Sequence, residues 1–166
     1  LAGNLARYLR EKKVRFTLGT AVERITPQIE TTQGSVSAGT TLVTAGAWTP
    51  LLTEALGWKP PIKPMRGTLL AIEPMRPMLN HIIMTPNFYY WQLSEGYIAG
   101  GGSVEDVGFR RGVDEETISS IRTEMDGLIP SVARRVEACR WSGFRPYCED
   151  TKPVVGLVPG EDKIFV

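Results

Sequence analysis

Four short β-strand patterns lie within about forty residues near the middle of this chain, and they constrain its fold more than any other feature. They cover residues 66–72, 81–84, 88–92 and 97–101. Strands this close in sequence leave no room for crossover helices, because a parallel connection needs about a dozen residues. Residues 93–96, Leu-Ser-Glu-Gly, are typical of a hairpin turn. The sequence therefore predicts an antiparallel sheet here.

One amphipathic helix follows these strand patterns. Asp114 is a typical N-cap for it. The apolar residues recur at helical spacing on one stripe: Ile118, Ile121, Met125 and Leu128. An alternating segment at 136–141 then predicts a further strand. We expect residues 62–143 to form the antiparallel sheet with its helix.

The two ends of the chain carry a different pattern. At 41–48 a buried strand runs into small residues, and a helix is predicted at 50–56. This arrangement lets backbone N–H groups approach a phosphate or a ring closely. Residues 154–156 and 164–166 resemble buried strands again. Earlier segments predict a helix on Leu1, Leu5, Tyr8 and Leu9 and strands at 14–18, 21–25, 28–32 and 35–38.

The layout is discontinuous. We predict an α/β (α+β) protein in which residues 1–58 and 144–166 form one unit and 62–143 form a second, inserted one. The proline-rich stretch at 59–64 is typical of a linker. Because the chain opens within a helical pattern and ends within a strand pattern, we expect it to be a fragment of a longer protein.

Charge and hydropathy exclude several classes of function. The chain has 19 basic and 18 acidic residues, and a formal net charge of +1 gives no basis for binding nucleic acid or an anionic membrane. No apolar run approaches the roughly 20 residues of a membrane span. Cys139 and Cys148 have no metal-binding spacing and predict reduced thiols in a cytoplasmic protein. With His81 as the single histidine, no metal site and no Ser-His-Asp triad is expected.

Arg145 is the strongest candidate for ligand binding. It stands between a strand pattern and Pro146, and a planar guanidinium can bind a carboxylate through two parallel hydrogen bonds. The alternative is an ordinary arginine at a strand end, solvated or bonded to backbone carbonyls. The residues around Arg145 favour the first interpretation.

Five runs stand in a fixed order along the chain. They are TAVERI at 20–25, VTAGAWTP at 43–50, KPMRG at 63–67, YIAGGGSVED at 97–106, and WSGFRP at 141–146 with KPVVG at 152–156. In this order they resemble the family of FAD-dependent amine and amino-acid oxidoreductases, which includes glycine oxidase, D-amino-acid oxidase and dehydrogenase, and sarcosine oxidase. The family's G-x-G-x-x-G and closing G-H-x-x-x-G runs are absent, so we expect this piece alone to bind FAD poorly.

The resemblance implies a fold and a reaction. The fold is part of a Rossmann-like FAD/NAD(P)-binding unit with an inserted antiparallel substrate sheet. The reaction is oxidation of a small amino acid or secondary amine by hydride transfer to FAD. Non-covalent FAD is expected, because Cys148 does not stand where the family's covalent link is made. The positions on the cofactor side are Val22, Thr44, Ala45, Gly46, Trp48 and Arg66.

The resemblance also assigns substrate residues. Arg145 matches the arginine that binds the substrate carboxylate, and Tyr89 matches the substrate tyrosine, with Tyr90 as its neighbour. Neighbours on a strand point to opposite faces, so only one of the two tyrosines can face the site. For Trp48 the alternative of core packing is favoured over a place near the flavin, and Arg66 is equally suited to a solvated strand end.

Other interpretations remain open. The same fold could oxidise a 2-hydroxy acid or glycerol 3-phosphate, since an arginine also suits phosphate. The chain could instead be a non-catalytic module for ligand binding or subunit assembly. Self-association into a homo-oligomer and the choice between oxidase and dehydrogenase are left open. The acids at 105–106 and 149–150 are interpreted as solvated turn residues.

Overall fold

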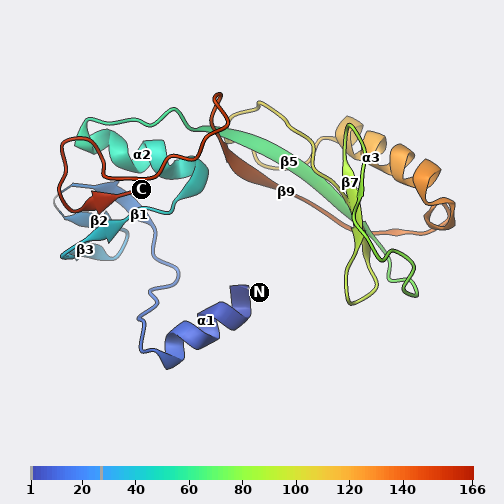
Figure 1. Cartoon of the computed structure of the whole chain (residues 1–166), viewed down its shortest axis with the longest axis horizontal. Helices are drawn as coiled ribbons and strands as arrows, with labels where there is room; N and C mark the ends of the chain where they lie inside the picture. Colours follow the sequence, from blue (N-terminus) through green and yellow to red (C-terminus); the bar gives the residue numbers. More distant parts are fainter. Residues whose placement is uncertain (1, 27) are drawn as a thin grey trace. The chain divides into compact units, whose positions relative to one another are not determined.

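A computed structural model of the chain describes residues 2–26 and 28–166 (Figure 1). Internal contacts divide the chain into two compact units. The first unit comprises the residues up to Val43, Pro50–Lys59 and Val155–Val166, and the second comprises Thr44–Thr49 and Pro60–Val154. Residues 144–154 thus group with the second unit, whereas the sequence boundaries place them in the first. The domain boundaries stay a prediction.

The chain begins with helix α1, Ala2–Glu11, which buries none of its residues. Leu5 and Tyr8 of the predicted apolar stripe are 55% and 53% exposed. Leu1, which the same stripe includes, lies outside the described residues. The helix is confirmed, and its apolar side is largely open to solvent. No helix in the described part of the chain has the length and apolar character to cross a membrane.

The first unit contains a three-stranded antiparallel sheet in the order β1-β2-β3. Its strands are Val22–Ile25, Ile29–Thr31 and Gly34–Val36. They confirm the strands predicted at 21–25, 28–32 and 35–38. The strand predicted at 14–18 is wrong, because these residues form no strand and Leu18 is 73% exposed. Alternation without a pairing partner is not enough to form a strand.

A short parallel ladder joins early and late segments of the first unit. Strand β4, Thr41–Leu42, pairs with β10, Ile164–Phe165. The helical elements that follow β4 are η1 (Gly46–Trp48), α2 (Thr49–Thr53) and η2 (Glu54–Leu56). Gly57 ends this stretch with a φ of 74°, a left-handed conformation that glycine adopts without strain. The helix predicted at 50–56 is therefore confirmed as α2 with η2.

The second unit is built on a five-stranded antiparallel sheet in the order β6-β7-β8-β5-β9. Its strands are β5 (Lys63–Ile72), β6 (Ile83–Met84), β7 (Tyr89–Gln92), β8 (Ile98–Gly101) and β9 (Glu137–Tyr147). The predicted antiparallel sheet is confirmed. Strand β9 runs beside β5 and continues to Tyr147, well past the predicted end at 141, because its pairing with β5 extends to Lys63 (Figure 1). This pairing carries Arg145 into the sheet.

Helix α3, Glu115–Leu128, packs against this sheet. The Asp114 side chain accepts a hydrogen bond from the Glu116 N–H at 3.0 Å and so caps the helix as predicted. The buried cluster that joins helix and sheet contains Leu70, Ile72, Tyr90, Ile98, Ile118, Ile121, Met125, Ile129 and Val132. Leu128, the last residue of the predicted stripe, is 45% exposed. The mixed α/β (α+β) class is confirmed.

Candidate functional site

The five-stranded sheet has two faces, and α3 packs on one of them. Adjacent residues of a strand point to opposite faces, whereas residues paired directly across strands share a face. The face beneath α3, which we call the helix face, carries Leu70, Ile72, Tyr90 and Ile98. The opposite face, which we call the second face, carries a row formed by Tyr89, Gly101, Leu69 and Trp141. Four residues beyond Trp141, Arg145 points to the same side.

Arg145 lies on the second face at a point where the sheet has no side chain. A Cβ placed on Gly67 would lie 2.7 Å from Nη2 of Arg145 and 2.8 Å from both Cζ and Nη1. Because these three distances are nearly equal, the guanidinium lies roughly flat over Gly67. Its Nη1 donates a hydrogen bond to the Ser103 carbonyl oxygen at 2.7 Å. The glycine makes the space, and the carbonyl fixes the orientation.

The charge of Arg145 has no carboxylate partner among the described residues. The other two arginines that are buried or half-buried are both neutralised, Arg66 by Glu105 and Arg122 by Asp126. A charge taken partly out of water is normally paired, because its desolvation is otherwise uncompensated. Arg145 is therefore a half-buried cation suited to an anionic ligand.

Tyr89 approaches the same short segment of backbone as Arg145. A Cβ on Gly102 would lie only 2.1 Å from Cε1 of the Tyr89 ring, so the ring occupies the space above that glycine. The ring also stacks on Trp91, with centroids 5.4 Å apart. Gly102 and Ser103 are consecutive, so the structure brings these two predicted substrate residues to adjoining positions on one face.

Tyr90 points the other way. Its side chain is fully buried on the helix face, where a Cβ on Gly100 would meet its ring at 2.2 Å. The hydroxyl donates to Oε1 of Glu124 at 3.1 Å. Burial, together with the negative charge of Glu124, raises the pKa of the Tyr90 hydroxyl. Of the two tyrosines proposed as catalytic, only Tyr89 shares a face with Arg145; Tyr90 is a core residue.

Arg66 is neither solvated nor free. It is 2% exposed and forms an ion pair with Glu105, with Nε to Oε2 at 2.8 Å. The interpretation of Glu105 as a solvated turn acid is wrong. Burial alone would raise the pKa of Glu105, but hydrogen bonds from Ser103, Thr68 and Arg66, with the charge of Arg66, bring it below its ordinary value. The guanidinium predicted to reach the cofactor is already occupied by Glu105.

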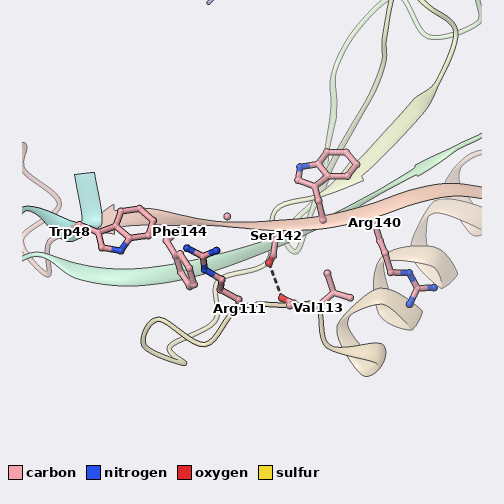
Figure 2. A pocket seen from close by; sticks show the side chains of 9 residues that line it. Trp48, Arg111, Val113, Arg140, Ser142 and Phe144 are labelled. Carbon is pink, nitrogen blue, oxygen red and sulfur yellow. Dashed lines mark hydrogen bonds between the residues drawn. The ribbon is translucent and has the colours of Figure 1, made fainter. Parts of the chain in front are cut away.

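Trp48 packs within an aromatic cluster. Its ring lies 5.2 Å from that of Phe109 and 5.7 Å from that of Phe144, between centroids. Figure 2 shows Trp48 and Phe144 side by side in a groove of about 520 Å³ along β9, which Arg111 and Ser142 also line. Phe144 alternates with Arg145 and so belongs to the opposite face. Trp48 therefore does not share the face of Arg145.

The remaining residues predicted on the cofactor side belong to different units of the chain. Val22 is in β1 of the first unit, 40% exposed and paired with Thr31. In the second unit, Thr44 is exposed, while Ala45 and Gly46 are half-buried. Gly46 has a φ of 57°, and a Cβ there would meet nothing within 4 Å. The backbone at Gly46 is thus open to close approach by a flat ring.

The described residues contain no cluster of possible metal ligands. No group of three or more histidine, cysteine, aspartate or glutamate side chains there could hold a metal ion. Both cysteines are free, Cys139 exposed and Cys148 half-buried. The candidate site therefore consists of a cation, a phenol and backbone groups.

Sequence reasoning missed the residues that support Arg145. Gly67, Gly102 and Ser103 have no predicted role and Glu105 is predicted to be solvated, although all four stand in the runs at 63–67 and 97–106. The signal for them was the glycine-rich end of a strand, since glycine in a strand often marks a close approach by a neighbouring group. Which group approaches depends on the cross-strand register, and the register appears only in the folded sheet.

The chain is similar to known proteins along most of its length. The family model described as FAD dependent oxidoreductase matches residues 1–166. Glycine oxidase from Pseudomonas aeruginosa is 27% identical over 138 residues, which cover 83% of this chain and 38% of that protein. D-amino acid dehydrogenase from Cereibacter sphaeroides is 28% identical over 165 residues, which cover 93% of this chain and 38% of that protein.

Solved structures share the fold at lower sequence identity. Glycine oxidase from Geobacillus kaustophilus matches with a TM-score of 0.82 and 23% identity, over 88% of this chain and 41% of that one. L-proline dehydrogenase from P. horikoshii matches with a TM-score of 0.87 and 18% identity, over 96% of this chain and 46% of that one. The chain thus spans less than half the length of each of these relatives.

Proposed function

Because the chain belongs to the FAD dependent oxidoreductase family across residues 1–166, we propose that it forms the substrate-binding part of a flavoenzyme that oxidises a small amino acid or secondary amine. The observation that carries this proposal is the half-buried Arg145, which has no carboxylate partner among the described residues. Glycine oxidase and D-amino acid dehydrogenase, to which the chain is similar, are named for substrates that bear both an amine and a carboxylate. A cytoplasmic location and a homo-oligomer are also kept as proposals.

Arg145 would hold the substrate through its carboxylate. Two charge-assisted hydrogen bonds from one guanidinium fix both the position and the plane of a carboxylate. Each contributes on the order of 1.5–3 kcal/mol in a partly desolvated site. Tyr89, which lies against the residue adjoining the Arg145 contact, would offer its hydroxyl as a further donor. Binding at these two points orients the carbon that bears the amine.

FAD would approach the backbone at 44–46 and would bind without a covalent link. The open space beside Gly46 and the exposed Thr44 allow a flat ring to approach the chain closely. Thr44, Ala45 and Gly46 would make these contacts, and a cofactor contact at Val22 stays a separate prediction from the family resemblance. Arg66 is left out of this proposal because Glu105 already pairs with it. FAD, when bound, would supply the hydride acceptor, and the chain would position the substrate.

A panel of matched substrates tests the proposal on the full-length protein that carries this chain. Glycine with methylamine, D-alanine with ethylamine and D-proline with pyrrolidine are pairs that differ by one carboxylate. We expect anaerobic bleaching of the flavin to be much faster with the carboxylate-bearing member of a pair, because only that member can bind Arg145.

Two further compounds separate the competing function. D-lactate and glycerol 3-phosphate also carry anions that an arginine binds well. Faster bleaching with either of them than with any amine would replace the proposed substrate class. A protein that holds no flavin at full length would instead favour a non-catalytic module.

Replacing Gly67 by alanine should impair substrate binding without unfolding the sheet. The new methyl group would lie 2.7–2.8 Å from the Arg145 guanidinium, which ends a flexible side chain and would move aside. We expect the KM for a carboxylate-bearing amine to rise about tenfold, equivalent to roughly 1.4 kcal/mol. Steady-state kinetics would measure it.

Gly143 provides the matched control. It pairs directly with Gly67 across the two strands, and a Cβ on it would meet nothing within 4 Å. Gly143→Ala should therefore leave KM near that of the parent protein. Equal changes in the two variants would show that Gly67 acts through the strand rather than through Arg145.

A further inference from the structure

The segment 103–105 is fastened firmly to strand β5. Arg66 and Glu105 exchange backbone hydrogen bonds in both directions, each 2.9 Å long, and Gly102 N–H donates to the Thr68 carbonyl at 2.9 Å. Thr68 N–H donates to Oγ of Ser103 at 2.8 Å. The backbone next to Arg145 is therefore held by β5 rather than left as a free loop.

The Glu105 carboxylate is the centre of the side-chain hydrogen bonds that hold this segment. Its Oε2 accepts from Nε and Nη2 of Arg66, and its Oε1 accepts from Oγ1 of Thr68 at 2.7 Å and from Oγ of Ser103. The side chains of Arg66 and Glu105 are 3% and 13% exposed. Charge-assisted hydrogen bonds with so little solvent exposure are strong and directional. Glu105 therefore holds the Ser103 hydroxyl in one position.

Ser103 links this network to the second face. Its hydroxyl bonds to Glu105, while its carbonyl oxygen accepts from Nη1 of Arg145 at 2.7 Å. Arg66 and Thr68, which hold Glu105, alternate with Gly67, over which the Arg145 guanidinium lies. One residue thus connects a buried ion pair on one side of β5 with a cation on the other.

We propose that Glu105, acting through Ser103, is the positioning residue for the substrate-binding guanidinium of Arg145. An arginine side chain has many accessible rotamers, so an unsupported guanidinium samples many orientations. A carbonyl held in place by Glu105 selects one of them and leaves the other N–H groups of Arg145 for the ligand. The inference rests on the proposed function, because it assumes that Arg145 binds the substrate carboxylate.

A double-mutant cycle on the full-length flavoprotein tests the inference, with D-alanine as the substrate. Ser103→Ala removes the hydroxyl but keeps the carbonyl. We expect it to raise KM about tenfold and to change kcat much less, since it weakens binding of the substrate carboxylate in the ground state. In the Arg145→Lys background the same change should raise KM less than twofold, because no guanidinium remains to be positioned. Ser103→Thr, which keeps the hydroxyl, should restore most of the parent KM.

Two further variants keep the test decisive. Thr68→Val removes one of the hydrogen bonds to Glu105 and should show the same dependence on Arg145 with a smaller rise in KM. Asp126→Asn breaks the half-buried ion pair between Arg122 and Asp126 on α3, away from Ser103, and should leave KM unchanged even where it lowers stability.

The outcomes separate the two proposals. If Ser103→Ala raises KM by the same factor in the parent protein and in the Arg145→Lys background, the positioning role is overturned and the substrate assignment stands. Thr68→Val gives the same test if Ser103→Ala does not fold. An unchanged KM in Arg145→Lys and Arg145→Ala would overturn the substrate assignment itself. If the Arg145 variants raise KM as expected but the effects of Ser103→Ala and Arg145→Lys are independent, only this inference is contradicted.

Discussion

Replacing Arg145 by alanine should lower kcat/KM for a carboxylate-bearing amine by about 10²- to 10³-fold in the full-length flavoprotein. The variant removes both hydrogen bonds proposed for the carboxylate and the only cation that the described residues leave unpaired at a half-buried position of the sheet. Most of the effect should fall on KM, because the carboxylate is held before and during the reaction. Steady-state kinetics with D-alanine would measure it.

Two controls separate the effect of the Arg145 charge from the effect of the substrate carboxylate. Arg145→Lys keeps the positive charge but loses the planar fork, so its effect should be intermediate. For ethylamine, which has no carboxylate, kcat/KM should be the same in the parent and in both variants. Equal losses for D-alanine and ethylamine would mean that Arg145 supports the fold of the site and does not bind the substrate.

Replacing Glu105 by alanine should lower the free energy of unfolding by about 3–5 kcal/mol. Arg66 is 2% exposed, and the variant would leave its guanidinium buried without a counter-charge. Urea unfolding of the full-length protein, followed by far-ultraviolet circular dichroism, would measure the loss. The double variant Arg66→Met with Glu105→Leu should recover most of it, because apolar side chains of similar volume can replace a buried ion pair. A double variant as unstable as Glu105→Ala would contradict the explanation.

The same carboxylate gives the stability a predicted pH dependence. The pKa of Glu105 in the folded state lies below its ordinary value of 4.5, so the ionised form stabilises the fold above that pH. The contribution is lost as the pH falls from 4.5 through the lower folded-state pKa. In Glu105→Gln this acid loss should be smaller. An identical acid profile in both proteins would show that folding does not lower the pKa of Glu105.

The sequence predicts the local elements of the second unit well. Periodicity locates the strands around residues 66–101, and Asp114 with its apolar stripe locates α3, because these signals depend on neighbours in the chain. The extent of β9 could not be predicted in the same way. Its last residues stay in the sheet only because β5 continues beside them as far as Lys63, about eighty residues away in sequence.

The candidate site shows the same limit. Arg145 can be found from the run at 141–146 that resembles a known family, and Tyr89 from its position ahead of the run at 97–106. Gly67 and Ser103 cannot, because their roles come from the register that places them under and beside the Arg145 guanidinium. The burial of Arg66 with Glu105 is likewise invisible in the sequence, where Arg66 follows a proline-rich stretch and Glu105 follows a glycine-rich one.

Strand β5 places Arg66, Thr68 and Leu70 on the helix face and Gly67 and Leu69 on the other. Substitutions at neighbouring positions should therefore have different effects, at Leu70 on the stability of the fold and at Gly67 on the proposed binding of the substrate. Successive mutations in a lineage can alter substrate preference at one set of positions while the core remains intact. Thr68, Ser103 and Glu105 are the exceptions, since a change there should affect both properties at once.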